Sequence, residues 1–229
     1  MKTKVLAALS VLLLSGIMAL AANAAENSYN KHVEESVKLL QEMEKQPEAA
    51  AVAHALKNGI GVAIFPKVLN IAVGVGGMGG DGLVLTKQGD GKWFGPSFAR
   101  IAGASLGLQA GVEESGLIFI INNAEGLAQF TEGKSFKLGA DAGVTAGPWS
   151  ADLDTSKVTK GNEPIYAYSV EKGVFAGISV KGAMIEPIKD LDRDYWGKEL
   201  PVNEVLSLQA EGKVAPLTEA LNNLMKKAK

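Results

Sequence analysis

Two glycine motifs match patterns that bind nucleotides or hold a catalytic serine. Residues Gly74–Gly79 fit G-x-G-x-x-G, which cradles a dinucleotide only where it follows a strand and opens a helix. Here Asp81-Gly82 leads into an apolar run typical of a strand, so the context favours a glycine-rich hairpin. Residues Gly103–Gly107 fit the nucleophile elbow G-x-S-x-G, but His32 and His54 both precede the serine, whereas such hydrolases place the histidine after it. Neither motif predicts catalysis.

Two further patterns resemble a serine–lysine pair and a calcium loop. Ser169 and Lys172 have S-x-x-K spacing, yet the serine ends a predicted strand at a tight turn instead of starting a helix. The run Asp190–Asp194 has the first three ligand spacings of a calcium loop, but Tyr195 stands where glycine is needed and Pro201 where the bidentate glutamate belongs. The two histidines lie on separate predicted helices and form no H-E-x-x-H pair. We therefore expect no enzyme, no metal site and no cofactor.

The composition is that of a folded globular protein. The 229 residues are 47% hydrophobic and 21% charged, with 27 glycines and no cysteine, which excludes disordered, collagen-like and disulfide-stapled proteins. This length predicts one folded domain, or two at most. The formal net charge of −2 includes no basic excess, so a nucleic-acid partner is not expected.

Residues 1–24 have the pattern of a secretory signal peptide. Lys2 and Lys4 precede an apolar run, Val5–Ala21, and Ala22-Asn23-Ala24 fits a small-x-small cleavage site. The alternatives are an uncleaved membrane anchor and cleavage after Ala21. We expect a periplasmic or secreted protein, soluble or peripherally associated with a membrane after signal cleavage. Without cysteine, the mature chain has no lipobox for a lipid anchor.

Amphipathic helices are predicted at both ends of the mature chain, over residues 27–58 and 200–229. An apolar stripe at helical spacing marks the first helix: Tyr29, Val33, Val37 and Leu40. Pro47 suits the first turn of a second helix, which Asn58-Gly59 would end. These stripes indicate packing against a core, with contact to a membrane as the alternative.

Between the helical ends, apolar residues recur with a period of two, which predicts a sheet. One short helix interrupts it, Ala124–Thr131, and turns are predicted at 88–91 and 171–173. The predicted strands are Gly61–Phe65, Ile71–Gly76, Gly82–Thr86, Ile101–Val112, Leu117–Asn122, Leu138–Ala146, Ile165–Val170 and Val174–Ile185.

Glycine and alanine alternate along four of these strands, so one face of the sheet is nearly bare of side chains. The stretches are 71–76, 104–111, 139–144 and 175–182. Strand glycines weaken a sheet and occur where another backbone comes close or where the sheet bends sharply. We therefore predict an α+β fold: a strongly curved antiparallel β-sheet or small barrel rich in Gly and Ala, flanked by N- and C-terminal amphipathic helices.

Several motifs occur in an order that resembles the SYLF domain family. They are Phe65-Pro66-Lys67, Gly80-Asp81-Gly82, Trp93 with Pro96, Gly107–Gly111, Leu138–Asp141, Ala146-Gly147-Pro148, Tyr168–Gly177 and Tyr195-Trp196-Gly197. Ordered motifs at long spacing are more specific than any single short pattern. Residues Trp149–Asp152, and Trp196 in place of a tyrosine, depart from the family's pattern. The resemblance covers about residues 52–197 and implies a single SYLF-like domain over residues 25–229.

The resemblance implies a lipid-binding domain without catalysis. Eukaryotic members are similar modules that bind phosphoinositide membranes through basic residues and an amphipathic N-terminal helix, and some bind actin filaments. For an exported bacterial-type protein, the implied ligand is an anionic phospholipid, and actin is not expected as a partner. The alternative is an envelope structural or protein-interaction domain without lipid binding.

An acidic chain needs lysines gathered on one side to bind an anionic surface. The lipid-binding candidates are Lys67, Lys137, Lys172 and Lys181, together with Phe175 beside the turn that carries Lys172. The first helix would supply apolar contact if it left the core to lie among lipid headgroups, through Tyr29, Val33, Val37 and Leu40.

Overall fold

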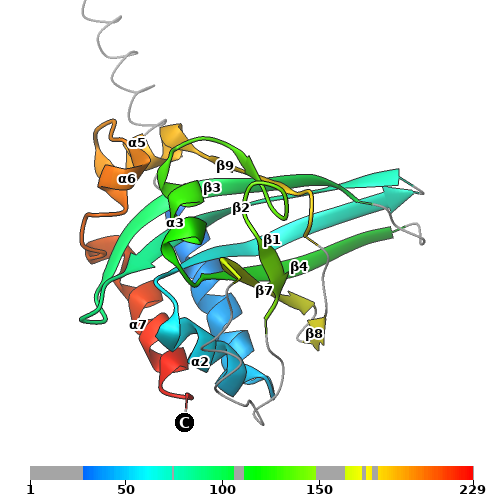
Figure 1. The fold of residues 1–229 in the computed structure, drawn as a ribbon, viewed down its shortest axis with the longest axis horizontal. Coiled ribbons are helices and arrows are strands. Elements are labelled where there is room, and N and C mark those ends of the chain that lie inside the picture. The colour runs from blue at the N-terminus through cyan, green and yellow to red at the C-terminus, as the bar shows by residue number, and fades with distance from the viewer. Residues whose placement is uncertain are drawn as a thin grey trace, which may run out of the picture.

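The structure, a computed structural model, describes residues 28–73, 75–105, 111–147, 163–171, 174–176 and 180–228. Its centre is a 9-stranded sheet in the order β5-β9-β3-β2-β1-β4-β7-β6, with β8 paired to β7. The paired strands are antiparallel except β6 and β7, which run parallel. Figure 1 shows the curved sheet and its flanking helices, which confirm the predicted α+β fold.

Four long strands form the middle of the sheet. They are β1 (Gly61–Val73), β2 (Val75–Lys87), β3 (Trp93–Ser105) and β4 (Gly111–Ile121). The shorter strands are β5 (Phe136–Lys137), β6 (Val144–Ala146), β7 (Ile165–Glu171), β8 (Val174–Ala176) and β9 (Met184–Pro187). Val73 pairs with Val75, so β1 and β2 form a hairpin, as the glycine-rich sequence predicts.

Helices cover both faces of the sheet near one end of the long strands (Figure 1). Residues 28–44 form a helix that packs with α2 (Ala49–Asn58) and α7 (Ala215–Met225) on one face, which we call the helix face. The opposite face packs against α3 (Ala124–Thr131) and α6 (Val202–Val205). The remaining helices are α5 (Lys189–Trp196) and the short 3-10 helix η1 (Gly212–Val214).

Strand β1 contributes to both cores. Val62 and Ile64 are buried on the helix face, whereas Ala63 and Phe65 are buried on the opposite face, because successive strand side chains alternate in direction. A bulge follows Phe65 and contains Pro66, which has no N–H to donate to a neighbouring strand. The bulge lies within one continuous strand, β1, which includes the strand predicted over 61–65. The strand predicted over 71–76 is wrong, because β1 ends at Val73 and Val75 already belongs to β2.

Two glycines of β2 allow the bulge to pack closely. A Cβ at Gly82 would overlap the carbonyl oxygen of Ile64 and the ring of Phe65. A Cβ at Gly80 would overlap the carbonyl oxygen of Lys67. The glycines of the Gly-Asp-Gly motif therefore serve a close backbone approach, which is a known use of glycine in strands.

Three other predicted strands differ in the structure. The strand predicted over 101–112 is wrong, because β3 ends at Ser105 and β4 begins at Gly111. The prediction of a strand over Leu138–Ala146 is wrong at its start, because Gly139 has a φ of +79° and the Asp141 carboxylate accepts a hydrogen bond from the Lys137 N–H at 2.7 Å, which makes a turn. The strand predicted over 174–185 is also interrupted, because Gly182 has a φ of +87°. The predicted helix over 124–131 is confirmed, and the Asn123 side chain caps it by accepting from the Gly126 N–H.

Candidate functional site

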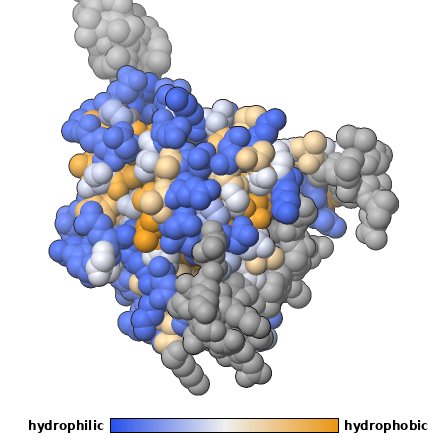
Figure 2. Space-filling model, in the orientation of Figure 1, coloured by the Kyte–Doolittle hydropathy of each residue, from blue (hydrophilic) through white to orange (hydrophobic). Residues whose placement is uncertain are grey.

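The long strands extend past the helices, and this projecting end carries exposed apolar side chains (Figure 1). Among the described residues, the exposed large apolar side chains are Leu69 (43% exposed), Ile71 (52%), Met184 (37%) and Val112 (66%). On the side seen in Figure 2, hydrophilic residues cover most of the helical end of the molecule. A contiguous exposed apolar patch marks a surface that contacts another molecule or a membrane.

Strand register places all four side chains on the helix face. Leu69 follows Val68, which is buried in the opposite core, so Leu69 points to the helix side. Ile71 pairs with Val112, and cross-strand partners share a face. The neighbouring row crosses four strands through successive pairs: Leu69, Gly79, Ala102 and Met184. We call this surface the apolar face and define it by Leu69, Ile71, Ala102, Ala104, Val112 and Met184.

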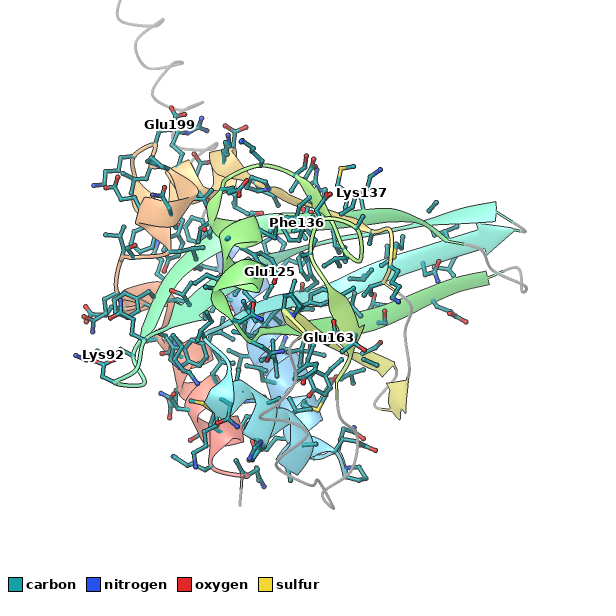
Figure 3. The ribbon with its side chains drawn as sticks, viewed as in Figure 1. Lys92, Glu125, Phe136, Lys137, Glu163 and Glu199 are labelled. Atoms are coloured by element: carbon teal, nitrogen blue, oxygen red, sulfur yellow. The ribbon has the colours of Figure 1, made fainter. Side chains whose placement is uncertain are left out.

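Two exposed lysines flank the apolar face at the β5–β9 edge. Lys137 pairs with Met184, so it continues the same row, and Figure 3 shows its side chain pointing away from the core. The Lys181 side chain passes over Gly139, where an added Cβ would lie 3.1 Å from its Cγ. Neither ammonium group has an ion-pair partner within the described ranges. The structure thus places Lys137 in the row of the apolar face and Lys181 beside the turn that follows β5.

The opposite edge of the apolar face is acidic. Glu114 of β4 is exposed and pairs with Leu69. The row therefore begins at a carboxylate on β4, crosses apolar and small residues, and ends at Lys137 on β5. An anionic surface would attract the β5–β9 edge and repel the β4 edge.

Lys67 occupies a different position from the other predicted lysines. It lies in the β1 bulge, and its Nζ is 2.9 Å from Oε1 of Glu35 on the helix at 28–44. This hydrogen bond raises the pKa of Lys67 above its ordinary value. The ion pair links the helix to the sheet, so the charge of Lys67 is partly neutralised by its partner.

The remaining predicted lipid-binding residues are Lys172 and Phe175. Lys172 lies outside the described residues. The backbone of Phe175 pairs with Val170 in the β7–β8 ladder, and its side chain lies outside the described part of the structure. Both stay predictions.

The apolar stripe of the first helix faces the core. Tyr29, Val33 and Leu40 are buried, and Val37 packs partly buried against the same cluster. The Lys213 Nζ donates a 2.6 Å hydrogen bond to the Tyr29 hydroxyl, which joins the helix to η1. Contact between this stripe and a membrane would require the helix to leave the sheet, so that role stays a prediction.

Sequence reasoning missed the apolar face itself. The alternation of glycine and alanine predicted a face with few side chains. The exposed patch is formed instead by the large apolar residues between these glycines and alanines and on the neighbouring strands. A signal was present: from Ile71 to Gly80 and from Ile101 to Val112 the sequence has no charged residue. Surface strands of this length normally carry charges on their solvent side, so uncharged ones suggest a partner.

Three residues of the motifs that resemble catalytic or metal sites are buried or half-buried in the fold. Asp192 is buried in α5, where its carboxylate accepts hydrogen bonds from the Ser97 hydroxyl at 2.8 Å and from the Phe98 N–H at 2.6 Å. Burial raises its pKa to about 6 despite these donors. Ser169 is buried within β7. Burial against Phe98 lowers the pKa of His32.

Among the described residues, no group of three or more His, Cys, Asp or Glu side chains could hold a metal ion. None of the helices in the described ranges is long and apolar enough to cross a membrane.

Comparisons with known proteins agree on one family. The family model described as "Ysc84: Las17-binding protein actin regulator" matches residues 102–228. Protein YSC84 of Saccharomyces cerevisiae is 34% identical over 174 residues, which are 75% of this chain and 36% of that protein. The human SH3 domain-containing YSC84-like protein 1 is 29% identical over 160 residues, which are 70% of this chain and 46% of that protein. The chain thus matches about a third to a half of the length of these relatives.

These comparisons correct the expectation about actin. The matching family is described as an actin regulator, and a further relative, 32% identical over 70% of the chain and 34% of its own length, is the yeast LAS seventeen-binding protein 3. The exclusion of actin as a partner is therefore wrong, because it rested on export alone and the family description names actin. One relative is thus named as a binding protein, and the family description names a binding protein and actin regulator.

The family match and the motifs cover overlapping parts of the chain. The family model spans more than half of the 229 residues, from β3 to the end of α7. The motifs that resemble SYLF domains begin earlier, at about residue 52, and end near residue 197. From both findings, the chain belongs to the Ysc84 (SYLF) family.

Proposed function

We propose that the protein is a non-catalytic module that binds anionic phospholipid membranes peripherally and reversibly. The observation that carries this proposal is the convergence of the exposed large apolar side chains of the described residues on one face, beside Lys137 and Lys181. Apolar insertion and basic attraction are the two contributions that hold peripheral proteins on membranes.

The magnitudes suit a reversible contact. Burying a Leu, Ile, Val or Met side chain completely contributes about 1.5–3 kcal/mol, and each lysine near an anionic surface contributes about 1 kcal/mol. Because the apolar side chains are already partly buried, only a fraction of the first amount is available. The acidic β4 edge opposes binding, so the molecule would approach the headgroups with its β5–β9 edge first.

The proposed location follows the sequence expectation of export. In a periplasmic or secreted protein, the accessible anionic lipids would include phosphatidylglycerol and cardiolipin. The alternative is an envelope protein-interaction domain, in which the same face would bind a protein and the molecule would not bind vesicles.

Actin regulation is a second candidate function, which the family description favours. Co-sedimentation of the purified protein with actin filaments tests it. Pelleting with filaments in a saturable manner would support this function, and its absence at concentrations that pellet lipid vesicles would count against it.

Vesicle co-sedimentation tests the main proposal. The protein should pellet with vesicles of neutral lipid mixed with phosphatidylglycerol or cardiolipin, and less of it should pellet at physiological salt. It should not pellet with vesicles of neutral lipid alone. Replacing both Lys137 and Lys181 by Gln should weaken binding about tenfold, since two charges contribute about 1–2 kcal/mol. The charge-matched control replaces Lys92 and Lys227, two exposed lysines at the other end of the long strands, and should bind like the wild type. Absence of binding at either salt would refute the proposal for these lipids.

A further inference from the structure

A pocket of about 660 Å³ lies at the end of the long strands opposite the β1–β2 hairpin. It is formed by the C-terminal end of α2, the turn between β2 and β3, and the C-terminal end of α7. Figure 3 marks this end of the sheet with Lys92 of the turn. Three lysines line the pocket, Lys57, Lys87 and Lys226, and its described lining includes no Asp or Glu.

Lys87 is the most enclosed of the three lysines. Its Nζ donates hydrogen bonds to the carbonyl oxygens of Leu56 at 2.6 Å and Lys57 at 2.7 Å, at the end of α2. It also lies 5.8 Å from the ring centroid of Trp93. Burial lowers the pKa of Lys87 to about 8, because no carboxylate in the described structure compensates its charge. The Nζ also lies 4.0 Å from the sulfur of Met225, so Lys87 would act on a ligand in the pocket through its positive charge.

Further hydrogen-bond donors face the same space. Asn222 lines the pocket, and its side-chain oxygen accepts from the Trp93 indole N–H at 3.0 Å, so the amide nitrogen is left as a donor. Lys57 and Lys226 are exposed, and the Nζ of Lys226 contacts the Asn223 side-chain oxygen at 2.9 Å. Ammonium and amide donors together match the acceptor oxygens of a phosphate group.

Helix dipoles account for part of this arrangement. A lysine in the last turn of a helix is stabilised by the negative end of the dipole, which explains Lys57 on α2 and Lys226 at the end of α7. Lys87 comes from β2 and enters the same space from a different element. The helix dipoles therefore do not explain Lys87. The pocket gathers three lysines from three elements, and its described lining has no carboxylate.

We propose that this pocket binds a phosphate monoester carried by a small molecule. Its volume lies within the range of about 300–1,000 Å³ that is usual for small-molecule sites. Met225 and Ile60 add apolar lining for the organic part of the ester. Strands of 13 residues separate the pocket from the β1–β2 hairpin by about 40 Å, so one lipid headgroup cannot occupy both the pocket and the apolar face. The site is therefore independent of the proposed membrane contact.

Calorimetric titration of the full chain tests the proposal. Inorganic phosphate and glycerol 3-phosphate should bind, and replacing Lys57 and Lys226 together by Gln should weaken binding at least about tenfold. The matched control is Lys227→Gln, which removes the same kind of charge one residue further along, outside the pocket, and should leave affinity within about twofold. Lys87→Met, checked for native circular dichroism, should also weaken binding.

A vesicle arm separates the two sources of a phosphate monoester. Binding of glycerol 3-phosphate that depends on the pocket lysines supports a soluble ligand. Binding only to vesicles containing phosphatidic acid, lost on replacing Lys57 and Lys226 but kept on replacing Lys137 and Lys181, supports a headgroup in the same pocket. The absence of binding in both arms, or binding that the pocket variants do not change, would overturn the proposal. None of these results depends on vesicle binding by the apolar face.

Discussion

Ile71 of β1 and Val112 of β4 lie directly opposite each other in an antiparallel ladder, and both side chains are more than half exposed. Such cross-strand apolar pairs are normally covered, because each side chain placed out of water contributes to stability. Here the pair lies beyond the helices that cover the rest of this face (Figure 1). The pair therefore forms the β4 side of the apolar face, which we assign to membrane contact.

Replacing Ile71 and Val112 by Ser should weaken binding to anionic vesicles about tenfold, which corresponds to about 1.4 kcal/mol. Because both side chains are exposed, the free energy of unfolding should change by less than about 1 kcal/mol. Vesicle co-sedimentation and urea denaturation measure the two effects. Val112→Ile keeps the apolar area and should bind like the wild type. Unchanged binding of the double Ser variant would contradict the role of this pair.

Gly82→Ala should destabilise the protein by about 2–3 kcal/mol, because the added Cβ would overlap the Ile64 carbonyl oxygen and the Phe65 ring. Gly89→Ala is the matched control, since a Cβ there would meet nothing within 4 Å. Urea denaturation of both variants makes the comparison. Equal stability of the two variants would show that β2 does not approach the bulge as closely as described.

Asp192 should make the stability of the protein depend on pH between about 4 and 6. The native carboxyl group has a pKa of about 6, above its ordinary value of 3.8, so in this window the native state binds more protons than the unfolded state. Its contribution to the free energy of unfolding is present at about pH 4 and falls, by up to about 3 kcal/mol, as the pH rises through 6.

Asp192→Asn removes this titration and keeps an oxygen to accept from the Phe98 N–H. The difference in unfolding free energy between wild type and variant, measured by denaturant titration from pH 4 to pH 7, should therefore shift in favour of the variant as pH rises. Groups that titrate equally in both proteins cancel in this difference. Parallel curves would mean that the buried carboxyl group does not have a raised pKa.

Lys67→Gln should lower stability slightly and change vesicle binding less than the Lys137 and Lys181 replacements do. The reason is that the Lys67 ammonium group is engaged by Glu35, whereas the other two have no ion-pair partner in the described parts of the chain. A double-mutant cycle with Glu35→Gln should give a small stabilising coupling. A larger loss of vesicle binding for Lys67→Gln than for the pair would reverse this ranking of the lysines.

The sequence by itself determined the class of fold and much of its local structure. Periodicity predicted the sheet and the helical ends, and turn and capping signals located the 88–91 turn and the end of α2 at Asn58-Gly59, because these features depend on neighbouring residues. It was less reliable where a glycine with positive φ broke a strand, as at Gly139, since the same residue type also occurs within regular strands.

Only the tertiary structure decided which residues share a surface. Leu69, Val112 and Met184 are far apart in the chain, and they meet on one face because β4 pairs with one side of β1 while β2 and β3 connect its other side to β9. The same is true of Lys57, Lys87 and Lys226, which three separate elements bring to one pocket. Strand pairing and helix docking depend on long-range burial, which the local sequence pattern does not specify. The sequence thus supplied the apolar and basic side chains, and the packing of the sheet determined where each group is exposed.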